Sequence, residues 1–109
     1  MYVPTKGDWK LFMKKVPDWQ ERYMGELVQE YIELLQSDKD ASEKFWILSE
    51  RMKKDKRKNG VQMTLIKSDM VDDILILMRE GAVKMKDLEE FSSELRDEVA
   101  EVVKHWRKK

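Results

Sequence analysis

The C-terminal third of the chain carries an apolar pattern that indicates an amphipathic helix. Large apolar residues recur there at intervals of three and four, and charged residues fill most positions between them: Leu88, Phe91, Leu95, Val99, Val102, Val103 and Trp106. At 3.6 residues per turn, this spacing gathers the apolar side chains on one stripe. Similar stripes occur along most of the chain, so we expect helices packed around a single core.

Composition limits the classes of protein that this chain can belong to. Its 109 residues are typical of one domain, and 22 basic residues balance 22 acidic ones, so overall charge favours neither nucleic acid nor an acidic partner. The sequence has no cysteine, which excludes disulfides, thiolate nucleophiles and cysteine metal sites. It has neither a long uncharged apolar run nor a signal-peptide pattern at its start, so we expect a cytoplasmic protein without a membrane span.

Two helices are expected in the first third of the chain. Thr5 and Asp8 have the spacing of a capping box, and the segment after them presents Trp9, Phe12, Met13 and Val16 on one side. Pro17 suits the first turn of a second helix, because proline lacks the N–H that this position leaves unpaired. That helix is expected to run to about Gln36 with these residues facing inward: Met24, Leu27, Val28, Tyr31, Leu34 and Leu35.

A third helix is expected after a turn at residues 37–40. Asp40 and Glu43 again have capping-box spacing, and Asn59-Gly60 should end the helix because both residues tolerate the left-handed conformation. The predicted buried stripe of this helix consists of Ala41, Phe45, Leu48 and Met52.

The second half of the chain predicts two more helices. One is capped by Ser68 or Asp69 and ends at Gly81, and it is apolar on all sides over residues 74–78, which favours a central position. The alternative is that Ile76 is exposed for a partner. Apolar alternation in segments 61–66 and 82–86 favours short extended pieces, whose pairing as a minor β-ribbon stays open. The sequence thus predicts an all-α single domain over residues 1–109, a compact bundle of four to five helices.

The candidate binding site lies on the third predicted helix. Six positive charges fall within residues 51–58, opposed only by Asp55. At about 100° per residue, Trp46, Lys53 and Arg57 point the same way, and an aromatic ring beside cations suits single-stranded nucleic acid or a phosphate-bearing ligand. A solvated last turn favoured by the helix dipole is the competing interpretation. The candidate binding residues are Trp46, Lys53, Lys54, Arg57 and Lys58, and the candidate interface residues are Ile47 and Ile76.

The acidic pairs and the single histidine give little support to an enzymatic function. Glu30-x-x-Glu33 and Asp69-x-x-Asp72 have the spacing with which helical nucleotide hydrolases hold magnesium, but both pairs lie off the apolar stripes and are expected to be solvated. The only histidine, His105, sits in a basic tail without a cysteine partner. We therefore expect no catalytic residues, no metal and no cofactor.

Several segments of the chain resemble short uncharacterised bacterial helical proteins of unassigned function. The resemblance covers Pro4–Trp9, Ser42–Trp46, Asp73-Ile74 with Gly81, and Asp87–Ser92 with Glu94-Leu95. It implies a bacterial helical domain and transfers no functional residue to this chain.

These observations lead to three hypotheses about function. The first is a small non-enzymatic protein-interaction or regulatory module with a protein partner or a second copy of itself, and without membrane contact. The second is nucleic-acid or phosphate-ligand binding through the basic helix around residues 46–58. The third is a carboxylate-metal nucleotide hydrolase.

Overall fold

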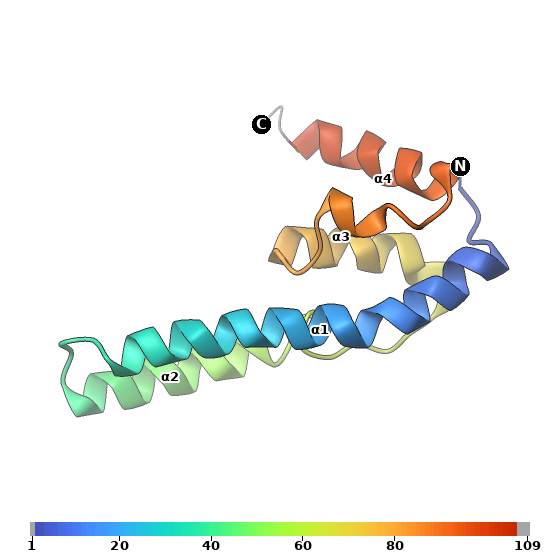
Figure 1. Cartoon of the computed structure of the whole chain (residues 1–109). Coiled ribbons are helices and arrows are strands. Elements are labelled where there is room, and N and C mark those ends of the chain that lie inside the picture. The colour runs from blue at the N-terminus through green and yellow to red at the C-terminus, as the bar shows by residue number, and fades with distance from the viewer. Residues whose placement is uncertain (1, 107–109) are drawn as a thin grey trace.

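A computed structural model describes residues 2–106 and is built from four α-helices (Figure 1). They are α1 (Lys6–Leu35), α2 (Ala41–Asp55), α3 (Met70–Glu80) and α4 (Ser93–Trp106). Two short 3₁₀ turns, η1 (Lys67–Asp69) and η2 (Met85–Leu88), precede α3 and α4. The described residues contain no strand, so the all-α prediction is confirmed. Between residues 2 and 106, no helix combines the length and the apolarity needed to cross a bilayer.

The first helix is one continuous element of 30 residues, so the prediction of two helices separated at Pro17 is wrong. Thr5 caps its start as predicted, because its side chain accepts a hydrogen bond from the Asp8 N–H at 3.1 Å. Proline inside a helix costs about 3 kcal/mol through the missing hydrogen bond and the ring clash. Burial of Val16 and Trp19 on either side of the proline holds α1 together across this defect.

The hydrophobic core lies between the N-terminal two thirds of α1 and the two helices α3 and α4. Stacked rings connect α1 to the segment before α4, with Trp19 and Phe91 centroids 6.1 Å apart. The buried apolar side chains include residues from every helix except α2: Phe12, Val16, Trp19, Tyr23, Leu27, Met70, Ile74, Leu77, Ala82, Val83, Leu88, Phe91, Leu95 and Val99. The inward stripe predicted for the C-terminal segment is confirmed in its first four members, Leu88, Phe91, Leu95 and Val99.

Helix α3 occupies the middle of this body, between α1 and α4 (Figure 1). It begins after Asp69 and ends at Gly81, so the position of both predicted ends is confirmed. Gly81 has a φ of 85°, the left-handed conformation that glycine adopts freely, whereas the Asp69 side chain makes no capping hydrogen bond. Met70, Ile74 and Leu77 are buried, while Ile76 is 44% exposed. The helix is therefore central without being enclosed on all sides.

The β-ribbon that the sequence left open between segments 61–66 and 82–86 does not form. Val61, Met63 and Leu65 pack singly against the core from an irregular segment. The N–H groups of Ala82 and Val83 instead donate to the Leu77 carbonyl oxygen, at 2.9 and 3.4 Å, and so close the end of α3. The apolar alternation in both segments reflects burial against the helices rather than strand pairing.

Helix α2 and the C-terminal half of α1 form an antiparallel helical hairpin that projects from the body (Figure 1). The Cα radius of gyration is 16.5 Å, compared with about 13 Å for a globular domain of this length, and the longest axis is 51 Å. Helix α2 ends at Asp55, four residues before the predicted stop at Asn59-Gly60. Neither Asn59 nor Gly60 has a positive φ, so the predicted reason for the stop is also wrong.

Gly60 is required for close packing rather than for backbone freedom. A Cβ atom added at Gly60 would overlap the ring of Tyr23. The segment after α2 can therefore lie directly against α1 only because residue 60 has no side chain. This contact sets where the hairpin joins the body.

Candidate functional site

The hairpin carries an exposed apolar surface made by both of its helices. On α1, Val28, Ile32 and Leu35 are spaced by four and three residues, which puts them on one side of the helix. On α2, Phe45 and Met52 are seven residues apart and share a side in the same way. We call these five residues the outer face.

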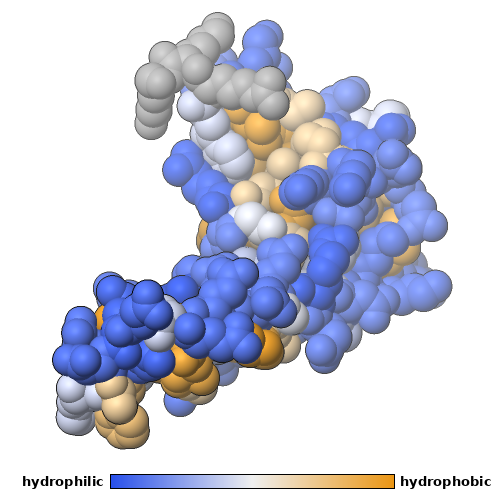
Figure 2. Space-filling model, turned by 60° about the vertical axis from the view of Figure 1, so that its left-hand side comes forward, coloured by the Kyte–Doolittle hydropathy of each residue, from blue (hydrophilic) through white to orange (hydrophobic). Residues whose placement is uncertain are grey.

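The two stripes of the outer face lie next to each other. Val28 of α1 and Met52 of α2 line the same shallow hollow, together with the half-buried Met24 and Tyr31. In Figure 2 the apolar residues of the projecting arm gather on its lower side, away from the body. Phe45 is 64% exposed, and its ring meets the neighbouring Trp46 ring edge-on at 5.0 Å.

The predicted orientation of these residues is therefore wrong. Val28 and Leu35 were expected to face inward, and Phe45 and Met52 were expected to form a buried stripe, but all four are exposed. The periodicity correctly identifies a continuous apolar side on each helix. It does not reveal that, among residues 2–106, only two helices lie at this position and no further element covers that side.

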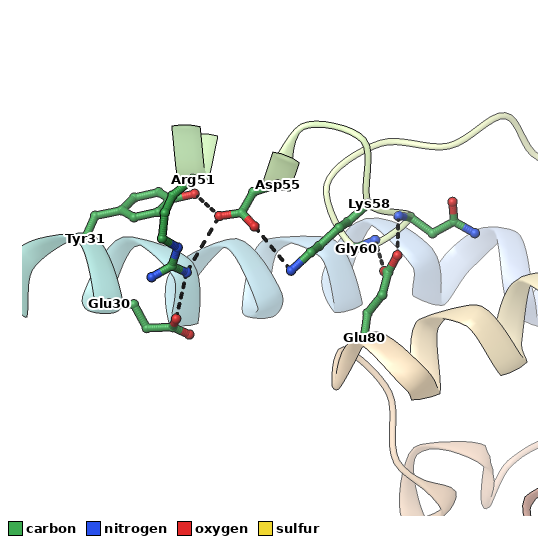
Figure 3. A network of polar contacts seen from close by, with 8 residues as sticks. Glu30, Tyr31, Arg51, Asp55, Lys58, Gly60 and Glu80 are labelled. Atoms are coloured by element: carbon green, nitrogen blue, oxygen red, sulfur yellow. Dashed lines mark hydrogen bonds and ion pairs between the residues drawn. The ribbon is translucent and has the colours of Figure 1, made fainter. Parts of the chain in front are cut away.

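The buried contact between the two helices of the hairpin is polar and centres on Asp55 (Figure 3). Asp55 is 5% exposed, and its carboxylate accepts a hydrogen bond from the Tyr31 hydroxyl. Lys58 Nζ lies 3.2 Å from Asp55 Oδ1, and a guanidinium nitrogen of Arg51 lies 3.8 Å from Asp55 Oδ2. The same Arg51 nitrogen donates to Glu30 on α1 at 2.8 Å.

These contacts stabilise the charged form of the buried acid. Burial by itself raises the pKa of Asp55, but hydrogen bonds from Tyr31 and Lys58 and the charges of Lys58 and Arg51 bring it below its ordinary value. Burial and the bond to Asp55 raise the pKa of Tyr31 to about 12, so the hydroxyl keeps its proton and remains a donor. Asp55 thus accounts for two of the six positive charges that the sequence places in residues 51–58.

A second carboxylate attaches the base of the hairpin to the body. Glu80, at the end of α3, accepts hydrogen bonds from the N–H groups of Asn59 at 3.0 Å and Gly60 at 2.9 Å (Figure 3). Gln20 of α1 donates to the Asn59 carbonyl oxygen at 2.9 Å. Three hydrogen bonds to two helices, α1 and α3, therefore hold the backbone just beyond α2, which orients the hairpin.

The candidate binding residues lie on the sides of α2 that solvent can reach. Trp46 is 66% exposed, as expected, and it lines a shallow groove with Lys54 and Lys58. Lys53 and Arg57 are exposed but do not line this groove. Two acidic residues, Glu50 and Asp55, also line the groove, together with Ile47 and Arg51.

The two candidate interface residues lie on different elements. Ile47 is half-buried on α2 and lines the groove beside Trp46. Ile76 lies on the exposed side of α3 and is not part of that groove. The structure therefore gives no single surface containing both.

The acidic pairs considered as metal ligands are not assembled into a site. Within residues 2–106, no group of three or more histidine or acidic side chains is arranged to hold a metal ion. Glu30 is engaged by Arg51, and Asp69 and Asp72 belong to the start of α3. His105 is exposed at the end of α4, with its Nε2 3.5 Å from a Glu101 carboxylate oxygen.

A buried acid at the other end of α1 was not anticipated as a structural centre. Asp8 accepts hydrogen bonds from the Tyr2 hydroxyl at 2.6 Å, the Ser92 N–H at 2.9 Å and the Ser92 hydroxyl at 2.5 Å. Burial acts to raise the pKa of Asp8, but these hydrogen bonds outweigh it and lower the pKa. The sequence pattern identified Asp8 only as part of a helix cap, since its partner is 84 residues away.

Comparisons with known proteins do not assign a family or a function to this chain. No protein-family model, no curated protein and no solved structure matches the chain. The resemblance to short bacterial helical proteins stays a prediction.

Proposed function

We propose that this protein is a protein-interaction module that docks through the outer face of its hairpin onto a partner with an apolar helical surface. The observation that carries the proposal is that α2 contributes no side chain to the hydrophobic core, although its apolar residues are regularly spaced on one side. Its only buried residue is the polar Asp55.

The size of the exposed surface supports this function. A helix of 15 residues owes most of its stability in water to burial of its apolar side. Phe45 is 64% exposed and presents on the order of 100 Å² of aromatic surface to solvent, and the other four residues of the outer face are each at least 39% exposed. Monomeric proteins seldom leave contiguous apolar patches larger than a few hundred Å² without a binding role.

A photoreactive residue placed beside the outer face tests this function. Ser49 is four residues after Phe45 and is exposed, whereas the exposed Ser68 lies outside the hairpin and serves as the control position. In a lysate of the source organism, we expect a discrete protein adduct from position 49 that disappears in the Phe45→Ser background, and no such adduct from position 68. Equal labelling from both positions, or an adduct insensitive to Phe45→Ser, would refute the proposal.

Binding of nucleic acid or another phosphate-bearing ligand is the second candidate. The exposed side chains of Lys53, Lys54, Lys56 and Arg57 support it, because none of them has an ion-pair partner among residues 2–106. Glu50 and Asp55 in the adjoining groove weaken the attraction for an anion. A labelled single-stranded oligonucleotide should shift at low salt and lose the shift in Lys53→Ala/Arg57→Ala, and the absence of any shift at low salt would end this candidate.

A further inference from the structure

We infer that residues 38–55, which we call the α2 segment, separate from α1 as one unit while the body stays folded, and that Asp55 holds this segment in place. The separated state is a minor population of the free protein. The inference goes beyond the proposed function, because it concerns the protein alone and needs no partner. A ligand that binds either state better would shift the equilibrium between them, so the separation is a conformational switch built into the hairpin.

The packing of the body does not include α2. The buried apolar side chains of the core come from α1, α3, α4 and the segments that flank the last two helices. None of the half-buried apolar side chains packed against this core belongs to α2 either. Asp8 of α1 also accepts two hydrogen bonds from Ser92, so α1 is joined directly to the start of α4. Departure of α2 therefore leaves the packing of α1 against α3 and α4 intact.

Polar contacts near its C-terminal end hold α2 against α1 (Figure 3). Asp55 is the only buried residue of α2, and its carboxylate accepts a hydrogen bond from Tyr31 and pairs with Arg51 and Lys58. The apolar Leu48 in the middle of α2 is only half-buried. When the helices separate, each polar contact is exchanged for a contact with water, so it contributes much less to stability than its strength in isolation. Separation of α2 therefore costs less free energy than unfolding of the body.

Residues that stay with α1 and the body bound the α2 segment at both ends. Before it, the N–H and hydroxyl groups of Ser37 donate to the Leu34 carbonyl oxygen, at 3.2 and 2.7 Å. After it, Glu80 of α3 accepts the hydrogen bond from the Gly60 N–H at 2.9 Å. None of these contacts involves α2, so they persist when the segment leaves.

The cooperativity of helix formation makes the α2 segment leave as a whole instead of fraying from one end. No residue of α2 before Asp55 is buried. A helix of 15 residues without a covered side is only marginally stable in water, because its nucleation is costly. Loss of the Asp55 contacts therefore removes what fixes every turn of α2, and the separated segment also loses helical structure.

Native-state hydrogen exchange of the full chain, followed by NMR in increasing urea, measures the separation. Backbone amides between Phe45 and Met52 should have protection factors at least about 100-fold lower than those of Leu77 and Val99 in the body. Protection of the α2 amides should change little with urea, because their exchange exposes little surface, whereas that of the body amides should fall steeply. Equal protection of the two sets, with one common urea dependence, would overturn the inference.

Two substitutions test whether Asp55 holds the segment. Asp55→Asn removes the buried charge at nearly constant volume, and it should lower protection at least about tenfold by one factor in every turn of α2. Protection of the body amides falls with it, because global unfolding includes departure of α2. Tyr31→Phe removes one hydrogen bond to Asp55 and keeps the ring, so it should give the same pattern with a smaller factor. Unchanged protection of α2 in both variants, or a change confined to the amides beside Asp55, would contradict the inference.

Asp8→Asn is the matched control, since Asp8 and Asp55 are both buried carboxylates with 5% exposure. Asp8 joins α1 to the start of α4, so this substitution weakens the body alone. Protection of Leu77 and Val99 should fall, while that of the α2 amides should stay at its value in the natural chain. Equal losses in the body and in α2 would mean that the molecule unfolds as one unit, against the inference.

Discussion

At the scale of single residues, two glycines have opposite structural roles. Gly60 lies where an added Cβ would overlap the Tyr23 ring, whereas Gly25 lies on the exposed side of α1 with open space around it. Gly60→Ala should lower the free energy of unfolding by about 2 kcal/mol through overpacking. Gly25→Ala should raise it by about 0.5–1 kcal/mol, because alanine favours the helix. Urea denaturation compares the two, and a Gly60→Ala protein as stable as the parent would contradict the close packing.

Asp73 is a residue-scale source of pH dependence. Burial, followed by the charges of Asp69 and Asp72, raises its pKa from 3.8 to about 6, and its Oδ2 atom has no hydrogen-bond partner among the described residues. The folded state then holds a proton that the unfolded state releases, so stability falls as pH rises from about 4 to about 6. Asp73→Asn should therefore stabilise the protein by about 1 kcal/mol above pH 6, after allowance for solvent screening at this partly exposed site, and by little below pH 4. Thermal melts across this pH range measure the difference, and a gain that does not vary with pH would contradict the prediction.

At the scale of elements, capping residues in the sequence predict where a helix ends better than apolar spacing predicts which side of the helix other elements bury. The start of α1 at Thr5 and the end of α3 at Gly81 depend on a few neighbouring residues, so the sequence predicts them. Continuity through Pro17 depends on burial against residues more than 70 positions away, such as Phe91, and a local rule for proline misses it. The exposure of Phe45 has the same origin, because it depends on where the other helices lie. For the candidate site, the exposed Trp46 was predicted, but the outer face itself was not.

Substitutions of two phenylalanines, the buried Phe91 and the exposed Phe45, measure how much each side chain contributes to stability. Phe91 is 3% exposed and packs on Trp19, so Phe91→Ala should cost about 3–4 kcal/mol of stability. Phe45→Ala should cost less than about 1 kcal/mol in dilute solution, because the side chain is largely hydrated in the folded monomer. Chemical denaturation at about 1 µM measures both free energies of unfolding. Equal losses from the two variants would mean that α2 is enclosed in the monomer.

At the scale of the whole molecule, the protein divides into a body with a complete core and a hairpin without one. Polar contacts at Asp55 join the two helices of the hairpin, and those at Glu80 attach its base to the body, while its apolar residues remain on the outer face (Figure 3). This division explains why a chain with enough apolar residues for one core has an extended shape. The surface that the core does not use is the surface that we assign to binding.

Small-angle X-ray scattering, extrapolated to zero concentration, tests most directly whether the hairpin projects with its outer face uncovered. The account predicts a radius of gyration for the monomer near 16.5 Å and a longest dimension near 51 Å. A radius near 13 Å, the value for a globule of this length, would mean that the hairpin folds back onto the body, and it would contradict the account.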